Sequence, residues 1–187
     1  MAAPELIVVG GANGSGKTTF ASRYHKALGV EFLNADNIAS TLSNQGVANA
    51  MIAAGRMFFT RLNELLDEGR TFVVETTLSG SYINKVALKA RRMGFRVVTV
   101  FIFLDSAELC VERVASRIVK GGHEVPTTDI IRRFSRANQN FRQNFTPLSD
   151  TWLLLYNGGD SFQEVASSTG DGTRIINPHR FAQFQSL

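Results

Sequence analysis

The segment over residues 11–18 has the pattern Gly-x-x-x-x-Gly-Lys-Thr, which combines flexible backbone with a cation and a hydroxyl. Glycines let the backbone turn its N–H groups inward around an anion. In this pattern Lys17 would act as a catalytic cation on the β- and γ-phosphates, and Thr18 would offer its hydroxyl to Mg²⁺. We therefore predict a phosphate-binding loop (P-loop) for a nucleoside triphosphate. Its nucleotide-binding residues would be Gly11, Ala12, Asn13, Gly14, Ser15, Gly16, Lys17, Thr18 and Thr19.

The segments on either side of this loop have the composition that the pattern requires. Residues 6–9 form a short continuous apolar run, typical of a buried parallel strand. A helix that begins at about Lys17 would carry Phe20, Tyr24 and Leu28 on one face. Its N-terminus would add the positive end of the helix dipole to the phosphate site. The alternative is a glycine turn that only caps a helix, with Lys17 in solvent.

Two acidic residues follow two further predicted strands. Asp36 comes after the strand over residues 31–34, and Glu75 comes after the strand over residues 71–74. The carboxyl ends of parallel strands line the crevice in which doubly wound sheets bind ligands. We expect Asp36 to accept a proton from a substrate hydroxyl as that hydroxyl attacks the γ-phosphate. Glu75 would bind the substrate or the waters around Mg²⁺.

Each residue of this second group also has a structural interpretation. Asp36 could cap the helix that follows it, and Glu75 could accept hydrogen bonds from backbone N–H groups of the next loop. The hydroxyls of Thr76, Thr77 and Ser79 either bind the substrate or stabilise a turn. These alternatives stay open at the level of the sequence.

A third group of candidate residues consists of arginines on two expected helices. Arg113 and Arg117 lie one helical turn apart, and Gly121 with Gly122 ends their helix before the next one begins. We expect residues 113–136 to form a lid. The second helix carries Arg132, Arg133 and Arg136. Closure of the lid would bring arginines onto the transferring phosphoryl group and exclude water. Alternatively, the basic residues only form solvated faces of the two helices and have no role in a lid.

A P-loop identifies the ligand and leaves the reaction open. A typical ATPase has an apolar strand that ends in Asp-Glu, whereas here Ser106 follows Asp105. The spacing of Asp105 and Glu108 is that of a capping box, so we predict that Asp105 caps a helix. A kinase is therefore the preferred interpretation. The alternatives are a nucleotide-dependent regulatory ATPase or switch without an acceptor, and a kinase directed at RNA or nucleotides.

Composition sets the class of protein. The chain has 187 residues, of which 44% are hydrophobic and 19% charged, a balance typical of one globular domain over residues 1–187. The net charge of +4 comes from dispersed residues and not from a basic block, which argues against nucleic acid as a partner. The single cysteine, Cys110, and the lack of a long apolar run predict a cytoplasmic protein without a membrane span.

Strands and helices alternate along the chain, which indicates a parallel sheet with helices on both faces. The expected strands cover residues 6–9, 31–34, 71–74, 97–103 and 151–156. The apolar faces of the later helices include Met51, Phe58, Leu62 and Leu65, then Ile83, Val86, Ala87 and Ala90, and then Ile130, Phe134, Ala137, Phe141 and Phe145. The predicted fold class is α/β, a P-loop NTPase three-layer sandwich with a mostly parallel central sheet. From Phe162 onward we expect a weak strand and a short final helix.

Taken in order, these segments resemble the short zeta-toxin-like P-loop proteins. The resemblance covers roughly residues 5–157 and rests on the P-loop and on the segments Asn34-Ala35-Asp36, Glu75-Thr76-Thr77-Leu78-Ser79-Gly80, Arg113-Val114-Ala115-Ser116-Arg117, Gly121-Gly122-His123-Glu124-Val125-Pro126 and Arg132-Arg133-Phe134. Zeta toxins are kinases that use ATP or GTP with Mg²⁺ to phosphorylate the 3′-hydroxyl of UDP-N-acetylglucosamine.

The resemblance implies roles for particular residues of this chain. Asp36 matches the catalytic base, and Glu75 and Thr77 match substrate-side residues. Arg113 and Arg117 match the lid arginines that act on the γ-phosphate. Arg132 or Arg133 matches a further arginine of the family, and we expect Arg132 to bind the substrate. The resemblance also implies a small-molecule acceptor such as a UDP-sugar, and an antitoxin protein as partner.

Overall fold

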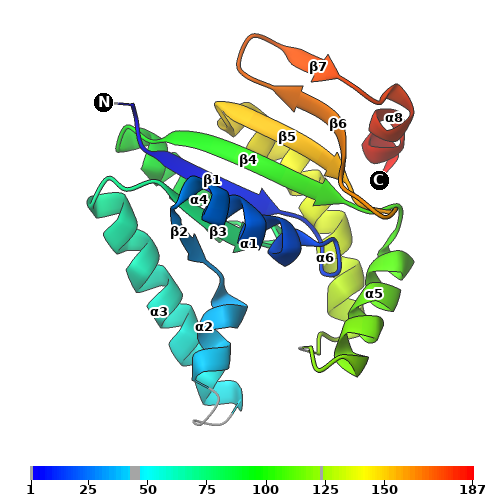
Figure 1. The fold of residues 1–187 in the computed structure, drawn as a ribbon, viewed down its shortest axis with the longest axis horizontal. Helices are drawn as coiled ribbons and strands as arrows, with labels where there is room; N and C mark the ends of the chain where they lie inside the picture. The colour runs from blue at the N-terminus through cyan, green and yellow to red at the C-terminus, as the bar shows by residue number, and fades with distance from the viewer. Residues whose placement is uncertain (1, 43–46, 123) are drawn as a thin grey trace.

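A central sheet of seven strands organises the protein, whose structure is a computed structural model that describes residues 2–42, 47–122 and 124–187. The strands follow the order β2-β3-β1-β4-β5-β6-β7 (Figure 1). Their bounds are β1 (Glu5–Gly10), β2 (Glu31–Leu33), β3 (Phe72–Thr76), β4 (Arg96–Phe103), β5 (Thr151–Tyr156), β6 (Gln163–Ser168) and β7 (Thr173–Ile175). The first five strands of the chain pair in parallel, and β6 and β7 extend the sheet in antiparallel.

Helices cover both faces of this sheet. They are α1 (Lys17–Leu28), α2 (Ala35–Thr41), α3 (Val47–Asp67), α4 (Tyr82–Arg92), α5 (Ala107–Val119), α6 (Thr127–Asn140), a π-helix (Phe141–Phe145), α7 (Thr146–Leu148) and α8 (Pro178–Ser186). α1 packs on one face, and α3, α4, α6 and α8 pack on the other. The predicted fold class, a P-loop NTPase α/β fold with a mostly parallel sheet, is confirmed.

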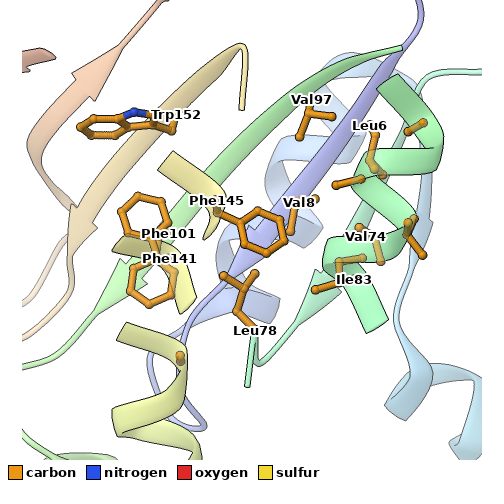
Figure 2. Close-up of a cluster of buried hydrophobic side chains, with 14 of the residues drawn as sticks. Leu6, Val8, Val74, Leu78, Ile83, Val97, Phe101, Phe141, Phe145 and Trp152 are labelled. Carbon is orange, nitrogen blue, oxygen red and sulfur yellow. The ribbon is translucent and has the colours of Figure 1, made fainter. Parts of the chain in front are cut away.

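The two layers of core follow from the alternation of side chains along each strand. On β1, Leu6 and Val8 point into the larger core, and Ile7 and Val9 point toward α1. Figure 2 shows the larger core, in which Phe101 stacks on Phe141 of the π-helix at a centroid distance of 4.5 Å. All these side chains are buried, so β1 is held rigidly where it leads into the P-loop.

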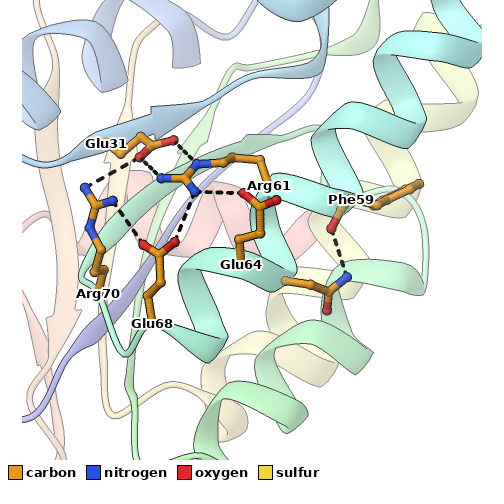
Figure 3. A network of polar contacts seen from close by, with 7 residues as sticks. Glu31, Phe59, Arg61, Glu64, Glu68 and Arg70 are labelled. Carbon is orange, nitrogen blue, oxygen red and sulfur yellow. Dashed lines mark hydrogen bonds and ion pairs between the residues drawn. The ribbon is translucent and has the colours of Figure 1, made fainter.

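A network of charges ties α3 to the edge strand β2 (Figure 3). Arg61 of α3 donates from Nε and Nη2 to the two carboxylate oxygens of Glu31, each at 2.8 Å. This bidentate geometry is the strong form of an ion pair, and the hydrogen bonds from Arg61 lower the pKa of Glu31. Glu68, directly after the end of α3, accepts from Arg61 and also from Arg70, which joins the network at its outer side. The network holds α3 beside β2, whose end leads into α2.

Several local predictions were less accurate. Leu28 is 46% exposed and does not share the buried face of α1. The helix expected to run from α6 through Phe145 changes to a π-helix at Phe141. The tail forms two short strands and α8, and α8 buries Phe184 in the larger core. The side chain of Met51 lies outside the described residues. Among the helices that the structure describes, none is long and apolar enough to cross a membrane.

Candidate nucleotide and acceptor site

The P-loop connects β1 to α1, and its glycines have a steric reason to be there. Gly11, Gly14 and Gly16 have φ angles of +147°, +79° and +94°, which residues with a β-carbon rarely adopt. A β-carbon on Gly14 would lie 2.9 Å from the carbonyl oxygen of Cys110, and one on Gly16 would collide with the side chain of Asn157. The loop therefore packs closely against α5 and the end of β5, and only glycine fits these positions.

Polar groups converge on the loop. Lys17 is 7% exposed, and its Nζ donates to the carbonyl oxygen of Ala12 at 2.8 Å. Burial lowers the pKa of Lys17, while the charges of Glu75 and Asp36 oppose this effect. Within the described chain, Asn13 Oδ1 and Ser15 Oγ are buried polar atoms without a hydrogen-bond partner. A buried cation and buried polar atoms without hydrogen-bond partners, at the N-terminus of a helix, are what a site for a bound triphosphate requires.

Glu75 is joined directly to the P-loop. Thr18 donates from Oγ1 to Glu75 Oε1 at 2.9 Å, and Asn34 donates from Nδ2 to Glu75 Oε2 at 2.5 Å. The contact follows from the sheet register, in which Val9 of β1 pairs with Glu75 of β3. The hydrogen bonds that Glu75 makes in the described structure therefore come from side chains, and not from the backbone N–H groups of the next loop. A hydroxyl and a carboxylate are oxygen ligands of the kind that suits Mg²⁺.

Asp36 lies in the first turn of α2 with its side chain exposed. The cap of this helix is Asn34, whose Oδ1 accepts from the backbone N–H groups of Asp36 at 2.7 Å and Asn37 at 3.1 Å. The capping interpretation of Asp36 is therefore wrong. The charge of Asp36 acts on Lys17, which places the carboxylate near the P-loop. Asn34, which sequence reasoning missed as a site residue, links both acids because it contacts Glu75 as well.

The threonines after Glu75 differ in their surroundings. Thr76 accepts from the backbone N–H of Leu78 through its Oγ1 at 3.1 Å, so this hydroxyl stabilises a turn. The hydroxyls of Thr77 and Ser79 lie 2.8 Å apart and form a hydrogen bond with each other. Both residues are half-buried. The hydroxyl of Thr76 thus accepts a hydrogen bond within the turn, and the hydroxyls of Thr77 and Ser79 pair with each other two and four residues after Glu75.

The arginines expected in a lid occupy two different environments. Arg113 of α5 is half-buried next to Gly14, and Arg117 is exposed but its charge still lowers the pKa of Lys17. Arg132 of α6 is exposed and forms an ion pair with Asp129 at 2.8 Å. The structure therefore brings Arg113 and Arg117 to the P-loop side and ties Arg132 to its own helix. His123, which carried part of the family resemblance, lies outside the described residues.

The helices α5 and α6 also pack against the P-loop through apolar side chains. Ala12 of the loop belongs to a buried cluster with Val114 of α5 and with Ile130 and Phe134 of α6. A displacement of either helix would therefore change the packing around Ala12 in the P-loop. The segment expected to be a lid is thus anchored at its base, and Gly121 of the expected hinge has a φ of +84°.

Asp105 does not cap α5, which corrects the prediction. The cap is Ser106, whose Oγ accepts from the backbone N–H of Leu109 at 3.3 Å. The carboxylate of Asp105 instead accepts from Tyr156 at 2.6 Å, Arg180 at 3.0 Å and Gln183 at 2.8 Å. Burial on its own raises the pKa of Asp105, but these hydrogen bonds and the charge of Arg180 outweigh it and lower the pKa. Asp105 thus anchors α8.

Two further residues near the site had no sequence pattern that could have revealed them. Asn157 follows β5 and donates to the carbonyl oxygen of Ser15 in the P-loop at 2.9 Å. Asn140, the last residue of α6, donates to the carbonyl oxygens of Leu78 and Gly80 in the loop after β3. Both contacts join segments that are distant in the sequence, so the residue pattern within either segment does not predict them.

The comparison of this chain with protein families gives a match that covers most of its length. A family model described as an AAA domain, AAA_33, matches residues 6–142. An uncharacterized protein of Haemophilus influenzae is 31% identical over 122 residues, which is 65% of this chain and 86% of that protein. The family match over residues 6–142 includes the P-loop, Asp36, Glu75, Arg113 and Arg117.

Solved structures resemble this chain at low sequence identity. The AvrRxo1-ORF1:AvrRxo1-ORF2 complex with ATP superposes with a TM-score of 0.75 at 20% identity, covering 97% of this chain and 63% of that one. The chain therefore spans less than two thirds of that relative. The PezAT chromosomal toxin-antitoxin system of Streptococcus pneumoniae gives a TM-score of 0.69 at 18% identity, covering 100% of this chain and 84% of that one. These likenesses establish a shared fold.

Proposed function

Because the chain belongs to the AAA domain family AAA_33, we propose that it is a P-loop kinase, which transfers the γ-phosphate of ATP or GTP to a hydroxyl of a small molecule. The observation that carries the proposal is the grouping of two acids beside one P-loop. Glu75 is hydrogen-bonded to Thr18, and the charge of Asp36 acts on Lys17. A phosphate donor site with acids next to it is what transfer to a hydroxyl requires.

In this proposal residues 11–19 bind the triphosphate. The backbone N–H groups of the loop and of the first turn of α1 surround the phosphates, and Lys17 binds the β- and γ-phosphates. When bound, Mg²⁺ would neutralise charge on the phosphates, and Thr18 and Glu75 are the residues that would hold it directly or through water. The hydrogen bond from Thr18 to Glu75 keeps both oxygen ligands together before the nucleotide arrives.

Asp36 is the general base in the proposed reaction. The acceptor oxygen forms a bond to the γ-phosphorus while the bond from that phosphorus to the β,γ-bridging oxygen breaks, and the hydroxyl proton passes to the Asp36 carboxylate. Asn34 supports this role because it starts the helix that carries Asp36 and also holds Glu75. Thr77 would bind the acceptor together with Glu75, and Thr76 would act by shaping their turn.

Arginines would stabilise the charge of the transferring group. Arg113 and Arg117 lie on the helix that packs against Gly14, so they are close to the place where the phosphates would bind. A guanidinium that contacts the γ-phosphate oxygens in the transition state lowers the barrier without chemistry of its own. Arg132 would join them only after it leaves Asp129, which makes it the weaker candidate.

The acceptor and partner are proposed from the family resemblance. A UDP-sugar is the first acceptor to test, because the site resembles that of zeta toxins and because a toxin-antitoxin system shares the fold. An antitoxin protein is the corresponding partner. The competing proposal, a regulatory ATPase without an acceptor, relied on Asp105 as its acidic residue. In this structure the Asp105 carboxylate is engaged by Tyr156, Arg180 and Gln183, which disfavours that role.

The experiment is a screen for transfer of γ-labelled phosphate from ATP and from GTP to UDP-sugars and other hydroxyl metabolites. We expect a labelled product with at least one acceptor and little release of inorganic phosphate without it. Rapid hydrolysis that no metabolite stimulates would contradict the kinase proposal and favour the regulatory ATPase. A steep loss of RNA binding with added salt would favour an RNA-directed kinase.

A further inference from the structure

The loop between β3 and α4 has an uncommon conformation. Leu78 has a φ of +57°, and among the described residues it is the single non-glycine residue with a positive φ. A side chain with a β-carbon is strained there, so the surrounding structure must hold it in place. The Leu78 side chain is fully buried in the larger core, and its Cδ1 lies 2.6 Å from where a β-carbon on Gly10 would be. Close packing against Gly10 therefore fixes one side of the loop.

Asn140 fixes the other side. Its Nδ2 donates to the carbonyl oxygen of Leu78 at 2.7 Å and to that of Gly80 at 3.2 Å. Its Oδ1 accepts from Asn84 of α4 at 3.2 Å and from Asn144 of the π-helix. One amide side chain thus connects the end of α6 with the loop and with α4. The loop is thus held to the end of α6 through the carbonyl groups of Leu78 and Gly80.

The clamped carbonyls belong to the residues that surround the hydroxyl pair beside Glu75. Thr77 precedes Leu78 and Ser79 follows it, and their hydroxyls meet at 2.8 Å. The orientation of both hydroxyls therefore depends on the backbone conformation of Leu78. If the clamp were released, Leu78 could relax from its strained conformation and the two hydroxyls would turn apart.

We propose that Asn140 is a positioning residue for the acceptor, which holds residues 77–81 so that Thr77 and Ser79 present their hydroxyls to the incoming substrate. The proposal rests on the proposed kinase function and concerns its acceptor half. It also connects the acceptor loop to the end of α6, a helix that begins within the segment 113–136 expected to act as a lid. Asn140 lies at the junction of α6 with a π-helix, a type of irregularity that is frequent at functional sites.

The test uses Asn140→Asp in the full chain. Aspartate has nearly the same size and can still accept from Asn84 and Asn144, but it places carboxylate oxygens against the carbonyls of Leu78 and Gly80. The matched control is Gln139→Ala, because Gln139 is the preceding residue of α6 and donates to Gln143, away from the loop. Both variants are compared with the wild-type chain in the same two measurements.

The first measurement is amide hydrogen exchange, which needs no acceptor. In Asn140→Asp we expect exchange over residues 77–81 to be at least about tenfold faster, with unchanged exchange in β1 and α1. The second is steady-state transfer to the acceptor that the screen identifies. The acceptor KM should rise about tenfold, the loss expected from weakened binding, while the Kd for ATP stays within about twofold. A purely structural role would change ATP binding and acceptor binding together.

The outcomes separate this proposal from the proposed function. An acceptor KM equal to that of Gln139→Ala, or unchanged exchange over residues 77–81, would overturn the positioning role of Asn140 even if the chain is a kinase. A wild-type chain that transfers phosphate to no acceptor would overturn the kinase, and the exchange comparison would still decide whether Asn140 clamps the loop. If Asn140→Asp does not fold, Thr76→Val removes a different hydrogen bond of the same loop, the one from the backbone N–H of Leu78, and should raise the acceptor KM in the same way.

Discussion

Replacing Lys17 with methionine should separate nucleotide binding from stability. Lys17 is 7% exposed, and its ammonium donates a hydrogen bond to the carbonyl oxygen of Ala12. Burial lowers its pKa, which means that the charged form is disfavoured by its surroundings in the nucleotide-free protein. A methionine of similar length removes this buried charge and retains apolar packing.

The two expected effects have different sizes. A hydrogen bond to a charged group contributes about 1.5–3 kcal/mol, which corresponds to an ATP affinity about 10- to 150-fold weaker in Lys17→Met. The free energy of unfolding without nucleotide should change by less than about 1 kcal/mol, because relief of the buried charge offsets the lost hydrogen bond. The variant would thus be folded and stable but poor at binding ATP.

The assay pairs calorimetric titration of ATP in the presence of Mg²⁺ with urea unfolding. Lys26→Met is the matched control, because Lys26 is an exposed lysine on the same helix. We expect the control to bind ATP like the wild-type chain. The reasoning is refuted if Lys17→Met binds ATP within about twofold of the wild type, which is less than the loss of one charged hydrogen bond. It is also refuted if Lys26→Met loses as much affinity.

Three further predictions concern the surroundings of the site. Gly14→Ala should weaken ATP binding at least about tenfold, because its β-carbon would meet the carbonyl oxygen of Cys110. The control Gly29→Ala should bind ATP like the wild type, because Gly29 also has a positive φ, +66°, but no atom lies within 4 Å of where its β-carbon would be. Equal ATP affinities of the two variants in a titration would contradict this. Burial raises the pKa of Cys110 to about 11, so its thiol should react slowly with a disulfide reagent at pH 8 and rapidly in urea; fast labelling of the native chain would disagree. Because the pKa of Asp105 is lowered in the folded protein, its carboxylate stabilises the fold above the unfolded-state pKa, and this stabilisation is lost as the pH falls through the folded-state pKa. Below about pH 4, the free energy of unfolding in urea should therefore fall less for Asp105→Asn than for the wild type. Parallel pH dependences of the two free energies would contradict this prediction.

The parts of the protein that depend on local sequence were predictable. The P-loop is one continuous pattern between an apolar strand and a helix, and the structure forms it there. The placement of Asp36 and Glu75 after parallel strands followed from a general rule of such sheets, and the structure puts both at the side of β1 on which β3 and β2 lie. Their proposed roles in transfer remain predictions.

The errors occurred where two neighbouring residues compete for one local role. Asn34 and Asp36 are both good helix caps, as are Asp105 and Ser106, and the sequence does not show which side chain turns toward the helix. The decision is made by partners that are distant in the chain. Asn34 also reaches Glu75 on the neighbouring strand, and Asp105 turns toward Arg180 of α8.

The tail was difficult to predict for a related reason. Strand β6 (Gln163–Ser168) has little apolar character, and β7 (Thr173–Ile175) is exposed along its whole length. β6 forms by pairing with the edge of β5, and β7 forms by pairing with β6, so neither strand depends on its own composition alone. The clamp formed by Asn140 was hidden in the same way, because it connects residues 60 and 62 positions apart.

Asp36→Asn measures the central claim most directly. Asparagine keeps the size of Asp36 and its place on α2 but cannot accept the proton of the acceptor hydroxyl. The exposed residue Asp171→Asn, in the turn between β6 and β7, is the control. We predict that γ-phosphate transfer by Asp36→Asn falls by about 10²- to 10⁴-fold, the contribution typical of general base catalysis, with the Kd for ATP unchanged. Transfer at the wild-type rate, with ATP bound equally well, would contradict the account.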